Sequence, residues 1–411
     1  MEAILDDASL LDSLESLTIG GSTQLDDLQL AHIYPGQITR FYASIYEALK
    51  QILSKAVNTN ILQISCWRLP ESFLPIILSL PHLQTLNLEC CMVFREIGQD
   101  DGYSHTQSSS ILNSRIDSTP LFEELPWSFL RGLTNLRVLS LIVHHNRSIV
   151  RAAIPFPPSV NPFATLERFL ASRLGPEDID AINSWIATAK TTIGRLRFTH
   201  FKLVAIYGFS EAQVITLLNA VSGAPIRYFS LDGVGCVEPD LFRRIAAALP
   251  DLEVLSLQHR TFFLHDMMAI WPAPLYEYAN ALKSELFPNL KHFIWDLRCD
   301  EYEYPGLYYA ALENGYRQED IVGIEEPPGD LGDPYREMDD VEEEWSRVCK
   351  LFALYCRTLQ TVTFLSGGLL LVQCAINRDS DGNVSVRLDY KGHTLKMEVC
   401  DPETTWPPLY A

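Results

Sequence analysis

Apolar residues recur along this chain with one spacing that returns at irregular intervals. In LPHLQTLNLECC, the residues Leu80, Leu83, Leu86 and Leu88 are separated by three, three and two positions, and Cys91 follows three positions later. A spacing of two places alternate side chains on one face of a strand. The pattern therefore predicts a short strand with one buried face.

The same spacing returns in the same phase further along the chain, in LTNLRVLSL (133–141), LPDLEVLSL (249–257), FPNLKHFIW (287–295) and CRTLQTVTF (356–364). Weaker copies occur near residues 14–19, 61–64, 163–169, 193–198 and 226–231. This period is typical of strand-bearing leucine-rich repeats. Because one unit cannot bury its leucines alone, the units must stack on one another. The predicted fold class is α/β, an irregular leucine-rich-repeat solenoid with a curved parallel sheet inside and helices outside.

Segments with a spacing of three to four residues alternate with the strands and predict the returning helices. They cover 35–57, 69–80, 176–189, 210–221, 239–249 and 341–354, and Ser210 is a suitable N-cap for the fourth. The chain ends differently, because 369–376 and 384–390 alternate in hydrophobicity around the turn sequence DSDGN. That pattern predicts a C-terminal β-hairpin.

These elements predict three regions. Residues 1–58 form an N-terminal strand and helix cap, and residues 369–411 form a C-terminal β-hairpin cap and tail. Between them, 59–368 is the repeat array. A polar insertion at 95–120 and an acidic, tyrosine-rich insertion at 300–344 interrupt the array, and we expect 94–119 to be an exposed loop.

Charge narrows the classes of partner. The formal net charge is -20 and the pI is about 4.9, which argues against nucleic acid or an anionic membrane as a partner, because phosphate binding requires a basic face. Residues 300–344 carry sixteen acidic side chains and two arginines, a net -14. This segment is either a solvated, partly disordered loop or a docking arm for a basic protein, with contacts from its tyrosines Tyr302, Tyr304 and Tyr308.

Cysteine use and hydropathy predict a compartment. The nine cysteines are an odd number without a regular framework, as expected for buried thiols in a reducing environment. The N-terminus MEAILDDASLLDS lacks the pattern of a signal peptide, and no run of eighteen apolar residues occurs. We expect an intracellular protein, cytoplasmic or nuclear, that does not enter a membrane.

Candidate chemistry is sparse. Residues 377–382 are similar to the first half of a calcium loop, but Leu388 stands where a bidentate glutamate would be needed, so a hairpin turn is favoured. His259 with His265 and Asp266 lacks a third ligand at a recognisable spacing, and a solvent-facing histidine at a strand end is favoured. No nucleophile or phosphate-binding motif is present. We expect no catalytic residue, no cofactor and no metal.

Over about residues 60–400, the repeat motifs and the closing hairpin together resemble the leucine-rich-repeat region of fungal F-box-type proteins. The resemblance implies protein recognition by the repeat surface and no catalytic residue. In that family an F-box recruits a ubiquitin-ligase scaffold, so such a partner is expected only if an F-box-like element exists. Residues 69–81, LPESFLPIILSLP, are similar to the start of an F-box, but Pro75 should break its helix, and an ordinary repeat helix is favoured.

The sequence thus favours a non-enzymatic, intracellular protein-recognition scaffold, related to substrate receptors of the F-box and leucine-rich-repeat type. The alternatives are an enzyme of unrecognised type, with chemistry in the insertions around His105 or His259, and a structural subunit of a larger assembly. The candidate partner-binding residues flank the leucines on the strands; Arg137, for example, should point away from the core. They are Gln84, Asn87, Glu89, Arg137, Ser140, Glu253, Ser256, Gln258, Lys291 and Asp296.

Overall fold

The structure is a computed structural model. The chain divides into two compact units, Met1–Phe198 and Thr199–Ala411. Both units are α/β, with mostly parallel strands joined by helices. The described residues are 13–20, 35–65, 68–70, 73–94, 111–118, 130, 133–143, 161–235, 237–259, 273, 275–296, 338–366, 369–380 and 382–389.

The first unit contains a parallel sheet whose strands follow one another in chain order, apart from β3. Its strands, in sheet order, are β1 (Ser16–Gly20), β2 (Ile61–Ser65), β4 (Thr85–Phe94), β5 (Asn113–Ser118), β6 (Val138–Val143) and β7 (Arg168–Leu174). The short strand β3 (Arg68–Pro70) pairs with β4 alone. The helical elements among its described residues are α4 (Pro35–Lys55), α5 (Phe73–Leu78), η2 (Pro162–Ala164) and α7 (Pro176–Ile193).

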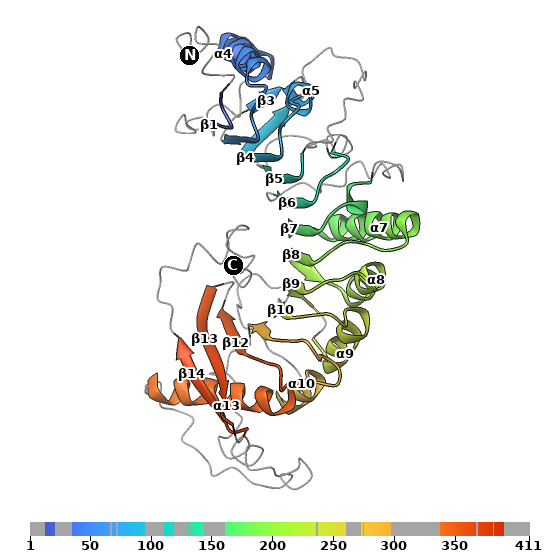
Figure 1. Cartoon of the computed structure of the whole chain (residues 1–411), viewed down its shortest axis with the longest axis vertical. Helices are drawn as coiled ribbons and strands as arrows, with labels where there is room; N and C mark the ends of the chain where they lie inside the picture. Colours follow the sequence, from blue (N-terminus) through green and yellow to red (C-terminus); the bar gives the residue numbers. More distant parts are fainter. Residues whose placement is uncertain are drawn as a thin grey trace. The chain divides into compact units, whose positions relative to one another are not determined.

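The second unit continues the same strand-and-helix alternation and ends in antiparallel strands (Figure 1). Its parallel strands are β8 (His200–Phe209), β9 (Tyr228–Val234), β10 (Val254–His259), β11 (His292–Trp295) and β12 (Thr361–Ser366). Antiparallel β13 (Leu369–Arg378) and β14 (Val384–Asp389) follow. The helices that the structure describes in this unit are α8 (Glu211–Val221), α9 (Pro239–Ala248), α10 (Leu275–Ala281) and α13 (Met338–Tyr355). Figure 1 shows α8, α9 and α10 on the same side of the sheet.

The repeated apolar spacing builds the core because the strands are in register. One row across the second unit consists of Phe229, Leu255, Phe293 and Val362, and the next consists of Leu231, Leu257, Trp295 and Phe364. All eight side chains have no solvent exposure. The helices close this core, since the ring of Phe352 on α13 lies 5.5 Å from that of Phe293 and 5.4 Å from that of Trp295. In-register stacking thus turns a sequence period into one continuous apolar layer.

Most predicted elements are present. The helix at 210–221 begins as expected, because the Ser210 hydroxyl accepts a hydrogen bond from the backbone N–H of Gln213 and the Gln213 side chain returns to the Ser210 N–H. The predicted hairpin is confirmed as β13 and β14. Cys349, Cys356 and Cys374 are buried free thiols, as expected of cysteines in a core.

The predictions for residues 113–118 and for Pro75 were wrong, and the helix predicted at 69–80 begins only at Phe73, after strand β3. Residues 113–118, expected within an exposed loop, form strand β5 between β4 and β6. Ser114 occupies the core row that holds Leu86 in β4 and Leu139 in β6, so the apolar period is missing although the strand is present. Pro75 does not break α5 either, because it is the third residue of that helix, where a backbone N–H has no intrahelical acceptor.

Candidate functional site

The residue that immediately precedes each parallel strand, here called the pre-strand position, is aligned from one repeat to the next by the backbone. In the second unit, the backbone N–H of each pre-strand residue donates a hydrogen bond to the backbone carbonyl of the pre-strand residue in the preceding repeat. These bonds run from Arg227 to Thr199 (2.9 Å), from Glu253 to Arg227 (2.8 Å), from Lys291 to Glu253 (2.8 Å) and from Gln360 to Lys291 (2.7 Å). In the first unit the same chain of bonds joins Asn60, Gln84, Leu112, Arg137 and Glu167. The pre-strand side chains therefore form a row with a fixed order.

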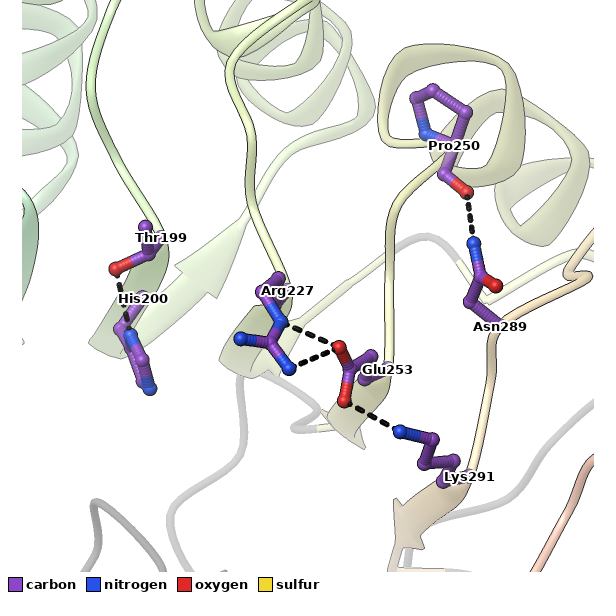
Figure 2. A network of polar contacts seen from close by, with 7 residues as sticks. All are labelled: Thr199, His200, Arg227, Pro250, Glu253, Asn289 and Lys291. Carbon is purple, nitrogen blue, oxygen red and sulfur yellow. Dashed lines mark hydrogen bonds and ion pairs between the residues drawn. The ribbon is translucent and has the colours of Figure 1, made fainter. Parts of the chain in front are cut away.

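Charges of opposite sign alternate along this row in the second unit. Figure 2 shows Glu253 between Arg227 and Lys291, with an ion pair to each. The Lys291 amine lies 3.0 Å from one carboxylate oxygen, and the Arg227 guanidinium holds the other. Burial alone would raise the pKa of Glu253, but hydrogen bonds from Lys291 and Arg227 outweigh it and hold the pKa below its ordinary value. Glu253 is thus a fixed carboxylate at neutral pH.

The first unit repeats the motif with one pair. The guanidinium of Arg137 donates two hydrogen bonds to the Glu167 carboxylate, at 2.8 and 2.7 Å, in the two-pronged geometry that arginine favours. The Arg137 side chain is about half exposed, so the prediction that it points away from the core is confirmed. This pair and the triad in the second unit are the two charged clusters of the row.

The sequence predicted Arg137, Glu253 and Lys291 as contact residues, but their partners Glu167 and Arg227 were not predicted. The signal was present, because each charged residue directly follows the equivalent apolar residue: Leu136, Leu166, Ile226, Leu252 and Leu290. Comparing the residue after this apolar position in every repeat, including the weaker ones, would have identified the whole row.

The other predicted contact residues divide by exposure. Gln84 is exposed and Asn87 is partly exposed, as a surface role requires, whereas Ser140, Ser256, Gln258 and Asp296 are buried. Ser256 is covered because its short side chain lies between Ser230 and Ile294 of the neighbouring strands. The backbone of Glu89 lies in β4, and its side chain is outside the described residues, as are Tyr302, Tyr304 and Tyr308.

A second group of polar side chains lies at the carboxyl ends of β9 and β10 and directly after β11. It consists of Asp232, Gln258, His259 and Asp296, all less than a tenth exposed. The prediction that His259 faces solvent was wrong, because its Nδ1 lies 2.6 Å from the carbonyl oxygen of Val234. Since a carbonyl can only accept, Nδ1 carries the proton. Burial lowers the pKa of His259, and the bond to Val234 offsets that only in part.

The calcium-like segment is the hairpin turn that the sequence favoured. Asn383 donates from its backbone N–H and from its side-chain amide to the two Asp379 carboxylate oxygens, both at 2.8 Å. Gly382 has a φ of 84°, which favours glycine. Within the described ranges, no three His, Cys, Asp or Glu side chains come together in a way that could hold a metal ion. His105, His265 and Asp266 lie outside those ranges.

No protein-family model matches the chain. No curated protein is significantly similar to it either. Among the residues that the structure describes, every helix is too short or too polar to cross a lipid bilayer.

Proposed function

We propose that this chain is a leucine-rich-repeat protein that recognises another protein and catalyses no reaction. Three features support the proposal: the strand-and-helix units, the in-register apolar rows, and the polar residues placed beside them at one repeated position. Stacked repeats of this kind bind partners through extended surfaces assembled from equivalent positions. The partner is a protein, and neither nucleic acid nor membrane is proposed.

The observation that carries the proposal is the charged pre-strand row. The side chains of Arg227 and Lys291 are 49% and 42% exposed, yet the backbone ladder and the shared Glu253 hold them in place. Charged groups that are ordered before binding lose little conformational entropy when a partner arrives. They also discriminate between partners by charge. The row therefore has the properties of a recognition surface.

The link to ubiquitin-ligase receptors is a narrower proposal. It requires an F-box-like element, and the segment similar to the start of an F-box forms the six-residue helix α5, after which the chain enters strand β4. A ligase scaffold is accordingly a partner to be tested separately from the recognised protein.

The test is affinity capture from native lysate with the full chain and two double variants. Arg227→Gln with Lys291→Gln removes two cations that share Glu253. Arg243→Gln with Arg244→Gln removes two cations that share Asp240 on the exposed side of α9, and serves as the matched control. We expect a protein recovered by the wild type and by the control, and recovered about tenfold less by the first variant. Equal recovery by all three forms, or recovery of no protein, would contradict the proposal.

Adding a purified ligase scaffold subunit to the same capture tests the narrower proposal. Retention of that subunit by the wild-type chain would support the receptor role. Its absence, with the partner still bound, would leave the recognition proposal in place and exclude the ligase link.

A further inference from the structure

A hollow of about 450 Å³ lies in the second unit where the loop after α10 meets the end of α13. We call it the α10–α13 hollow. Its volume falls within the range of sites that bind small ligands. Its lining consists of Lys283, Ser284, Glu285, Leu354, Tyr355 and Arg357.

Hydrogen bonds between the two loops fix the walls of the hollow. The backbone N–H of Ser284 donates to the carbonyl of Tyr355 at 3.1 Å, and the backbone N–H of Arg357 donates to the hydroxyl of Ser284 at 2.8 Å. On the other side, the carbonyl of Lys283 accepts from the N–H groups of Leu286 and Phe287. The lining backbone is therefore formed before any ligand binds, which reduces the entropic cost of binding.

Three charged side chains line the hollow without satisfying one another. Among the described residues, neither the Lys283 amine nor the Arg357 guanidinium takes part in an ion pair or a side-chain hydrogen bond, and Glu285 pairs with neither of them. Two uncompensated cations facing one hollow are notable in a chain with a net charge of -20. They provide a local positive potential for an anion.

The end of α13 does not oppose that potential. The carbonyls of a helix C-terminus carry partial negative charge. Here the guanidinium of Arg378 donates to the carbonyls of Ala353 and Cys356, and the N–H of Ser284 donates to that of Tyr355. Because other groups satisfy these carbonyls, the guanidinium of Arg357 is left available for a ligand.

The hollow also has an apolar wall. Leu354 lies in the last turn of α13 and is 49% exposed, which makes it one of the few exposed large apolar side chains among the described residues. The partly exposed Tyr355 lies next to it. A ligand that reaches both cations would cover these two side chains. Covering them would add a hydrophobic contribution to the ionic one.

We propose that the α10–α13 hollow binds a carboxylate carried on an apolar or aromatic body, either a free organic acid or the C-terminal residue of a peptide. Arg357 contacts the carboxylate through its planar fork, and Lys283 supplies a second positive charge. Leu354 and Tyr355 cover the body of the ligand. Glu285 disfavours a dianion, so a carboxylate is preferred over a phosphate. This site is separate from the pre-strand row and does not depend on the recognition function proposed above.

The test is calorimetric titration of the full chain with N-acetyl-phenylalanine and with its amide, which differs only in lacking the charge. We expect saturable binding of the acid and about tenfold weaker binding of the amide. Arg357→Gln and, separately, Lys283→Gln should each weaken binding of the acid about tenfold. Arg387→Gln removes an exposed cation on β14 and should leave it unchanged. Inorganic phosphate should not compete.

A peptide arm identifies the source of the ligand. The probe is a hexapeptide that ends in a phenylalanine carboxylate. If it binds more tightly than N-acetyl-phenylalanine and loses binding when its C-terminus is amidated, the ligand is the end of a peptide chain. If it binds equally or more weakly, the ligand is a free acid. The proposal is overturned if no probe binds saturably, if phosphate competes as well as the acid, or if the Arg357 and Lys283 variants bind like wild type. Urea midpoints equal to wild type would confirm that both variants are folded.

Discussion

The guanidinium of Arg378 on β13 donates a hydrogen bond of 2.6 Å to the backbone carbonyl of Leu359, in the loop that leads from α13 into β12. Its other amino group donates to Ala353 and Cys356 at 3.2 and 3.0 Å. One side chain of the hairpin thus satisfies three carbonyls around the end of α13. That helix carries no basic residue in its last turn, so Arg378 supplies the positive charge that a helix C-terminus favours.

Replacing Arg378 by alanine should therefore lower the free energy of unfolding by about 2 kcal/mol, because three carbonyls lose a charged donor at once. Urea denaturation followed by circular dichroism measures the change. Arg387→Ala is the matched control, since this arginine is exposed on the neighbouring strand β14 and should cost less than about 0.5 kcal/mol. Equal midpoints for the two variants would show that the three bonds contribute nothing.

Gly233 on β9 is held in a conformation that excludes a side chain. Its φ is 103°, and a Cβ at this position would lie 2.8 Å from the carbonyl oxygen of Ala205 on β8. Gly223 also has a positive φ, 78°, but a Cβ on this residue would have no other atom within 4 Å. The two glycines share an unfavourable φ but differ in the contact.

Gly233→Ala should cost about 3 kcal/mol or more, because strain adds to a clash with backbone that cannot move alone. Gly223→Ala should cost only about 1 kcal/mol, the usual penalty for positive φ. Thermal denaturation of the two variants separates the cost of the positive φ from the cost of the steric clash. Should both lose the same stability, the close approach of β8 to β9 would not be the cause.

The stretches that could be predicted from the sequence are those in which one local period determines burial. Leu255 and Leu257 are core residues because strand alternation and in-register pairing act together, and both follow from spacing alone. The hairpin was equally local, since its turn depends on Asp379, Gly382 and Asn383. Strand β5 was missed because Ser114 holds a leucine position, and no period indicated helix α10.

The candidate site was only partly predictable, because it depends on relations between repeats. Glu253 and Lys291 are 38 residues apart, and Arg227 and Glu253 are 26 apart, so no constant interval pairs them. Only the register of the strands brings them together. Burial was harder still to predict, since Gln258 has the alternation of an outward residue and is nevertheless covered.

Two buried or partly buried histidines make the free energy of unfolding depend on pH, at pH values above those at which carboxylates titrate. His259 and His292 both have pKa values below the ordinary 6.5, in each case mainly because of burial, and for His292 also because of the positive charge of Lys291. The unfolded chain therefore binds protons that the folded chain does not. Stability is full above about pH 6.5 and is lost as pH falls below it, with a slope of at most about 1.4 kcal/mol per pH unit for each histidine.

The urea midpoint of the wild-type chain should accordingly be lower at pH 5.5 than at pH 7.5, and His259→Gln should reduce that difference. Glutamine retains a donor for the Val234 carbonyl but does not titrate, so the substitution removes the proton linkage of His259 while that of His292 persists. His82→Gln, which replaces an exposed imidazole, is the matched control variant. A midpoint that rises on acidification, or a His259→Gln difference equal to that of the wild type, would show that the buried imidazole is not the group that titrates. The pKa of Glu253 is lowered, so its contribution to the free energy of unfolding persists throughout this pH window and is lost only below it. The ion pairs of the pre-strand row therefore do not contribute to the difference between the two midpoints.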